Sequence, residues 1–392
     1  MADIITTITA SPTLLSFAGN PIIYKVKTSK SLGSDESFLR IRCKAVFSLN
    51  GSVGSYSGNA NFTTEMSQPV ENLGTAVFNL SDAVQTLVRN VQSSFDMEGE
   101  EILSSYGIIA NIEFKTVWVY ENAEFESSAE YAPMLFIIPG AFTDFEMLSF
   151  ASTDLLSLTS EGKLMTRKPD GGILYKGETL IVPTVYGFYD VENPGTLDSK
   201  IVSHSLSVGG LVVSDGSSLI ECNKLDYQVV SAVNEGSDGD FVFESTVGRS
   251  LSGYYMASDY GVHLLRFING FGAVENISVR SRDKLSYEVS GENHSLVQEI
   301  GVRPTDRRYS TKSQPVGVYE LSSGYVPQRW AEWYVQELLT SPRVWIQLGG
   351  KWIPALIEAS DECVIYDRSN PEMPHVDFTL RLAVDGVTGC VW

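Results

Sequence analysis

Residues that could carry chemistry are few and scattered in this chain. It contains no phosphate-binding loop, no helical zinc motif and no serine-hydrolase elbow. The nearest look-alikes are the segment 54–58, which has Tyr56 where a nucleophile would stand, and Gly270-Phe-Gly272, which lacks a third glycine. We therefore expect no catalytic residue and a protein that is not an enzyme.

Metal and cofactor sites also lack a local signature. No two of the four histidines are close enough to share a helical face, namely His204, His263, His294 and His375. Asp238 and Asp240, on either side of Gly239, could ligate calcium, but the remaining oxygen ligands of a calcium loop are missing and a plain turn is the alternative. The sequence predicts no bound metal and no cofactor.

Paired carboxylates leave one enzymatic alternative open. A glycosidase needs only two acidic side chains at the right separation, and the chain has 48 aspartates and glutamates. Aromatic faces can stack on sugars as well as on another protein. A carbohydrate-binding or carbohydrate-cleaving protein that recognises a host-surface glycan is therefore the alternative hypothesis.

Charge and composition exclude several classes of protein. The 28 lysines and arginines against 48 acidic residues give a net charge of −20, which argues against nucleic acid as a partner. No apolar run approaches the length of a membrane span and no secretory signal is visible at the start, so we expect no membrane insertion and folding in a reducing cytoplasm. The four cysteines, Cys43, Cys222, Cys363 and Cys390, are predicted to be small buried side chains.

The elements that would position any site are mostly strands. Alternation of apolar and polar residues predicts long half-buried strands over 39–49 and 108–120, and a helix over 81–91 with Ser81 as its N-cap. Short strands with turns, one of them at Asp215-Gly216, fill the middle of the chain. A second helix over 326–340 precedes strands that include a hairpin closed by Gly349-Gly350.

These patterns predict a mainly β protein with tandem antiparallel β-sandwich or barrel-like domains and two short helices. We divide it into a β domain with one helix (residues 1–130), a connector with short strands (131–195), a central β-sandwich (196–310), and a module of one helix and four strands (311–392).

Tryptophans gather in the last module, which contains five of the six in the chain. Trp330 and Trp333 flank the apolar face of the second helix, and Trp392 ends the chain. We expect these three residues to be partly exposed in an isolated chain and to become covered at an intermolecular interface.

Three segments carry a resemblance to a known group of proteins. They are Phe17-Ala-Gly-Asn-Pro21, the run from Leu264 to Gly272 with Glu275, and the run from Arg329 to Trp333 with the segments that follow it at 338–344 and 352–354. In this order they resemble tail-tip or baseplate structural proteins encoded by phages and prophages of Bacteroides-type bacteria. The resemblance implies a virion component without enzymatic activity, present in symmetry-related copies around the tail.

The composition and the predicted fold are compatible with this resemblance. An acidic, β-rich chain without catalytic motifs suits a structural subunit that binds other copies of itself and other virion tail proteins through its surface. Its expected location is the virion tail.

Overall fold

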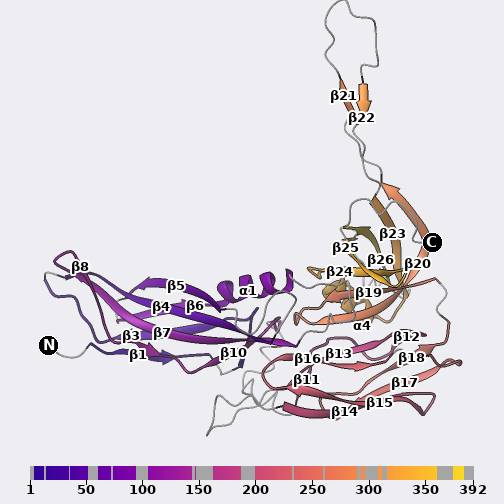
Figure 1. The fold of residues 1–392 in the computed structure, drawn as a ribbon, viewed down its shortest axis with the longest axis horizontal. Coiled ribbons are helices and arrows are strands. Elements are labelled where there is room, and N and C mark those ends of the chain that lie inside the picture. The colour runs from indigo at the N-terminus through magenta and orange to yellow at the C-terminus, as the bar shows by residue number, and fades with distance from the viewer. Residues whose placement is uncertain are drawn as a thin grey trace, which may run out of the picture.

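A computed structural model describes residues 4–12, 15–34, 36–51, 61–71, 74–93, 105–143, 146, 162–186, 199–231, 234–258, 261–288, 293–295, 308–310, 316–359 and 374–383. The predicted class is confirmed, because the chain is mainly β and contains several sheets, a closed barrel and two helical segments. Figure 1 shows an elongated lobe at the N-terminal end and, beside it, a lower lobe with the barrel above. None of the helices in these ranges has the length and apolar character needed to cross a membrane.

The elongated lobe pairs a small sheet with a large one. The small sheet contains β1 (Thr6–Ala10), β3 (Ile23–Thr28) and β6 (Thr75–Asn79). The ten-stranded sheet contains β2 (Leu15–Phe17), β4 (Glu36–Gly51), β5 (Asn61–Pro69), β7 (Tyr106–Tyr120), β8 (Ala123–Glu126), β9 (Glu130–Tyr131), β10 (Leu135–Ile138), β11 (Lys163–Leu164), β13 (Leu180–Val185) and β16 (Leu225–Val230). The two long strands predicted from alternation are β4 and β7, which pair antiparallel along most of their length.

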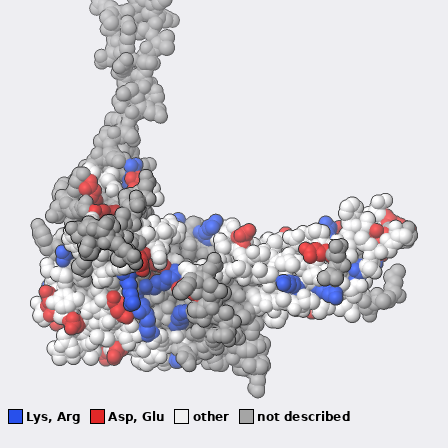
Figure 2. Space-filling view, turned by 180° about the vertical axis from the view of Figure 1, so that it is seen from behind, with Lys and Arg blue, Asp and Glu red and all other residues white. Residues whose placement is uncertain are grey.

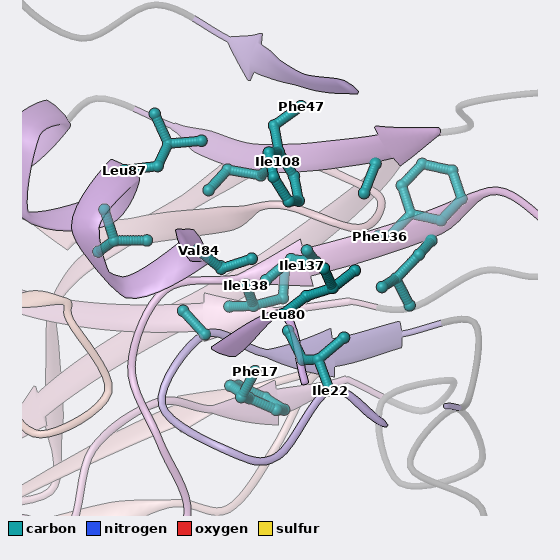
Figure 3. Close-up of a cluster of buried hydrophobic side chains, with 14 of the residues drawn as sticks. Phe17, Ile22, Phe47, Leu80, Val84, Leu87, Ile108, Phe136, Ile137 and Ile138 are labelled. Carbon is teal, nitrogen blue, oxygen red and sulfur yellow. The ribbon is translucent and has the colours of Figure 1, made fainter. Parts of the chain in front are cut away.

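The core of this lobe follows from the alternation of buried and outward-facing residues along its strands. Alternate residues of β4, from Ile41 to Leu49, are buried and face the same interior as the apolar side of α1 (Ser81–Ser93). Figure 3 shows this packing, with Val84 and Leu87 of the helix near Phe47 and Ile108. Removing these apolar side chains from water supplies the main stabilisation of the lobe.

The start of α1 differs from the prediction in one detail. Ser81 does not cap the helix with its side chain, because its hydroxyl accepts a hydrogen bond from the backbone N–H of Ile22 (3.0 Å) and bonds to Asn79 (2.6 Å). The first helical bond runs instead from the Val84 N–H to the Leu80 carbonyl (3.1 Å). The Ser81 hydroxyl, which the local pattern assigned to the N-cap, is therefore used in hydrogen bonds outside the helix.

The lower lobe is a β-sandwich. One layer is the β11–β13–β16 end of the large sheet, and the other is a five-stranded sheet ordered β12 (Gly172–Tyr175), β18 (Leu251–Met256), β17 (Gly239–Ser245), β14 (Ser199–Val208) and β15 (Leu211–Glu221). The hairpin turn between β14 and β15 is Gly209-Gly210, both with positive φ. The predicted turn at Asp215-Gly216 is wrong, because both residues lie inside β15 and pair with β14.

The barrel closes in the order β19 (Val262–Ile268), β20 (Val274–Glu288), β23 (Val316–Tyr325), β26 (His375–Leu382), β25 (Lys351–Ala359) and β24 (Val344–Leu348). The hairpin between β24 and β25 is closed by Gly349-Gly350 as predicted, both with positive φ. A short pair, β21 (Asn293–Ser295) and β22 (Arg308–Ser310), stands above the barrel in Figure 1. The second predicted helix is α4 (Gln328–Trp333), which continues as a π-helical turn, η1 (Tyr334–Leu338).

Sheet hydrogen bonding crosses the boundaries expected from the sequence. The barrel takes β19 and β20 from the predicted central unit and its other four strands from the last module, while β11, β13 and β16 extend the first sheet. The division into four units remains a prediction. Cys43 and Cys222 are buried, as expected, and Cys363 and Cys390 lie outside the described residues.

Candidate functional site

The two helical tryptophans are buried, contrary to the expectation that they are partly exposed. Trp330 is 5% exposed and Trp333 is 3% exposed. The Trp330 indole N–H donates to the Asp170 carbonyl (3.0 Å), and Trp333 packs edge-on against Phe267 of the barrel (5.6 Å between ring centroids). The helix surface that carries these two tryptophans is therefore covered by the same chain. Trp392 lies outside the described residues.

The three segments that carry the sequence resemblance meet at one place, which we call the junction. The Gly19 N–H, in the first segment, donates to the Gly140 carbonyl (2.8 Å), and the neighbouring Ala141 N–H donates to Gly270 in the β19–β20 turn (3.1 Å). The Gly270 N–H in turn donates to the Glu337 carboxylate on η1 (2.6 Å), and the Ile268 N–H of the same run donates to the Arg343 carbonyl of the third segment (3.1 Å). The junction thus joins the elongated lobe, the barrel and its helix.

Backbone segments approach closely at the junction. Gly140 has a φ of +90°, and a Cβ on this residue would lie 2.0 to 2.2 Å from backbone atoms of Phe271. Only glycine fits both the conformation and the space. Asn269 holds the facing turn, because its side-chain oxygen accepts the N–H groups of Phe271 (3.0 Å) and Ala273 (2.9 Å).

Arg167 is the central charged residue of the junction. Its guanidinium donates to Glu337 (2.6 Å), to Glu146 (2.9 and 2.8 Å) and to the Ala141 carbonyl (2.9 Å), and it stacks on Phe271 (4.0 Å to the ring centroid). Burial raises the pKa of Glu146, but the hydrogen bonds from Arg167 and Thr143 outweigh it, so the pKa is lowered. Glu337 is the most buried member of this network, and Arg167 holds both carboxylates and the Ala141 carbonyl in one geometry.

A second set of buried polar groups lies beside this network. The Asn269 side-chain N–H donates to the Met165 carbonyl (2.8 Å) and to the Glu275 carboxylate on β20. Burial raises the pKa of Glu275 to about 7, although Lys168 and the Asn269 hydrogen bond oppose the shift. Glu178 also has a raised pKa because of burial, and it accepts a hydrogen bond from the Ser278 hydroxyl (2.5 Å).

Sequence reasoning missed the charged members of the junction. Arg167 and Glu337 are 170 positions apart, and neither stands in a recognisable local motif. The sequence did single out the run from Leu264 to Gly272 with Glu275. This run comprises most of β19 and the β19–β20 turn at the junction.

A groove opens between the barrel and β12. Its volume is about 80 Å³, and its lining residues come from β12 and the preceding loop, β20, the end of β23 and α4. Tyr325 at its rim is 71% exposed, and its ring meets His375 edge-on (5.6 Å between centroids). Trp330 forms part of the wall, so this helical residue does contribute to a surface, through one edge of its ring.

The charge of the groove is opposite to that of the whole chain. Lys168 and Arg280 are the charged residues among its described lining residues, although the chain carries a net charge of −20. Lys168 interacts with the buried carboxylates of Glu178 and Glu275. In the part of the chain that the structure describes, Arg280 bonds to uncharged groups, the Tyr175 hydroxyl (3.2 Å) and the Met256 sulfur (3.9 Å). Figure 2 shows lysine and arginine side chains close together where the barrel meets the lower lobe.

A second open surface is the edge of the five-stranded sheet, formed by β15. We call it the β15 surface and define it by four exposed apolar side chains, Ile201 (69%), Leu211 (74%), Val212 (65%) and Leu219 (61%). Ile201 and Leu219 face each other across the β14–β15 ladder, and the other two follow the turn. Within the described residues β15 pairs only with β14, and it contains neither lysine nor proline to protect its free edge.

The metal and histidine candidates are placed apart. The Asp238 carboxylate accepts a hydrogen bond from the Ala257 N–H (2.8 Å), and the His204 ring is buried beside Phe243. No group of three or more residues able to ligate a metal occurs in the part of the chain that the structure covers.

No family model matches the sequence, and no curated protein matches it. The similar solved structures include the native conformation of Escherichia coli alpha-2-macroglobulin, with 10% identity, 81% of this chain and 22% of that chain covered, and a TM-score of 0.23. They also include the plexin A4 extracellular region (11% identity, 98% and 34% covered, TM-score 0.18) and the C-terminal domain of the Streptococcus pyogenes antigen I/II-family protein AspA (9% identity, 64% and 98% covered, TM-score 0.16). The chain spans about a fifth and a third of the first two proteins, and similarity at this level carries no functional argument.

Proposed function

We propose that this protein is a non-enzymatic structural subunit of a phage tail tip or baseplate, which assembles through its β surfaces into a symmetric oligomer. Its partners are other copies of itself and other virion tail proteins, and its location is the virion tail after folding in the host cytoplasm. The sequence resemblance motivates the assignment to a tail. The observation that supports assembly is the β15 surface.

A free strand edge with exposed apolar side chains favours association. Unpaired backbone groups along β15 can pair with another strand, and its apolar side chains would leave water on contact. Fully burying a side chain such as Leu219 contributes about 1.5 to 3 kcal/mol. In a ring of identical subunits the same surface would be used in every copy.

The junction supports the same role by holding the lobes in a fixed arrangement. A subunit that carries load between neighbours requires lobes that do not move independently, and the Arg167–Glu337 ion pair joins the lower lobe to the barrel helix. The side chain of Glu337 is only 2% exposed in this pair, so water screens the interaction little.

The test is the mass of the purified protein by light scattering over a range of concentrations. We expect a discrete ring-sized mass, and we expect the double variant Ile201→Ser, Leu219→Ser to shift the oligomer to monomer at concentrations where the native protein is assembled. Each substitution should weaken association at least about tenfold. Leu356→Ser, at a 58% exposed leucine on the barrel, is the matched control and should leave the mass unchanged. A native protein that is monomeric at every concentration, or a double variant that assembles normally, would contradict self-assembly through this surface.

A further inference from the structure

We propose that the groove between β12 and the barrel binds a carboxylate-bearing saccharide, with the Arg280 guanidinium on the carboxylate and the Tyr325 ring on the face of the sugar. This site is separate from the β15 surface and does not depend on the assembly role.

The charge of the groove selects an anion. Among the described residues no carboxylate lines it and the partners of Arg280 are uncharged, so no described carboxylate neutralises its positive charge. The bonds from its Nε to the Tyr175 hydroxyl and from Nη2 to the Met256 sulfur, a weak acceptor, orient the guanidinium and use two of its five N–H groups. A planar guanidinium can bind both oxygens of one carboxylate, which gives direction as well as strength.

The aromatic rim selects a ligand with a flat apolar face. Tyr325 presents most of its ring to solvent, and its contact with His375 limits how the ring can turn. A pyranose ring offers such a face through its C–H groups.

The dimensions of the groove disfavour an extended peptide. About 80 Å³ holds a carboxylate and part of one ring but no helix. The Trp330 ring lies over the face of β12 at Gly172, where a Cβ would lie 2.3 Å from it, and closes one side of the groove. The absence of carboxylates among the lining residues also means that the groove supports binding of a carbohydrate and not its cleavage by an acid pair.

The experiment is a titration of the full-length protein with sialyllactose and with an oligogalacturonate, followed by saturation-transfer NMR and calorimetry. Neutral lactose is the matched ligand control. We expect the two acidic saccharides to bind and lactose not to bind measurably. Arg280→Gln and Tyr325→Ala should each weaken binding about tenfold or more, since a hydrogen bond to a charged group contributes about 1.5 to 3 kcal/mol.

The variant control is Arg329→Gln, which removes the same charge from an exposed position on α4 that does not line the groove. It should bind the saccharides within about twofold of the native protein, and thermal melting should show that all three variants are folded. Equal binding of lactose and sialyllactose, unchanged binding by Arg280→Gln, or no binding of either acidic saccharide would overturn the proposal. Binding of an oligoglutamate peptide in their place would overturn it in favour of an acidic protein segment.

Discussion

Glu275 should make the stability of the barrel depend on pH. Its carboxyl is buried on β20, and burial raises its pKa from 4.5 to about 7 in the folded protein. In the unfolded chain the group would titrate near 4.5, so between these values the folded state holds a proton that the unfolded state has lost. The stabilisation from this group is fully present below about pH 4.5, and it is lost as the pH rises towards about 7.

The magnitude follows from the separation of the two pKa values. A difference of one in pKa corresponds to about 1.4 kcal/mol, so the full loss is about 3 kcal/mol in the free energy of unfolding. Lys168 opposes the shift and Glu337 adds to it, so both neighbours belong to the environment that sets it. The substitution Glu275→Gln removes the titration while keeping a side chain of similar size that can still accept from Asn269.

The assay is urea unfolding of the native protein and of Glu275→Gln at about pH 5 and about pH 8, followed by tryptophan fluorescence. We expect the stability difference between the two proteins to shift in favour of the variant by about 2 to 3 kcal/mol between these pH values. The other titrating groups cancel in this comparison because both proteins contain them. Glu332→Gln, at a half-buried position on α4, is the control that makes the same chemical change elsewhere. The same stability difference at both pH values would refute the assigned pKa.

Two further predictions concern packing and charge where the barrel meets the other lobes. Gly172→Ala should destabilise the protein by about 1 to 3 kcal/mol, because the new Cβ would lie 2.3 Å from the Trp330 ring. Gly236→Ala, which has open space around it, should change the melting temperature little, and equal effects would contradict the contact. Glu337→Ala should cost about 1 to 3 kcal/mol in urea unfolding, because Arg167 keeps Glu146 but loses this partner and the Gly270 N–H loses its acceptor. A cost near that of an exposed surface substitution would show that the ion pair does not hold the lobes.

The sequence alone determined the elements whose signals are local. Alternation from Ile41 to Leu49 predicted β4 because a strand turns successive side chains to opposite faces, and Gly349-Gly350 predicted a hairpin because both residues adopt positive φ. The absence of catalytic motifs and the acidic net charge were also readable directly, and they led to the hypothesis of a structural protein.

The tertiary structure decided what covers each apolar face and which distant charges meet. The sequence placed Trp330 and Trp333 beside the helix face but could not show that β12 and the barrel bury them. It likewise gave no sign that Arg167 and Glu337 form an ion pair across 170 positions. The physical reason is that periodicity records which side of an element avoids water, whereas the partner on that side depends on chain segments far away in sequence.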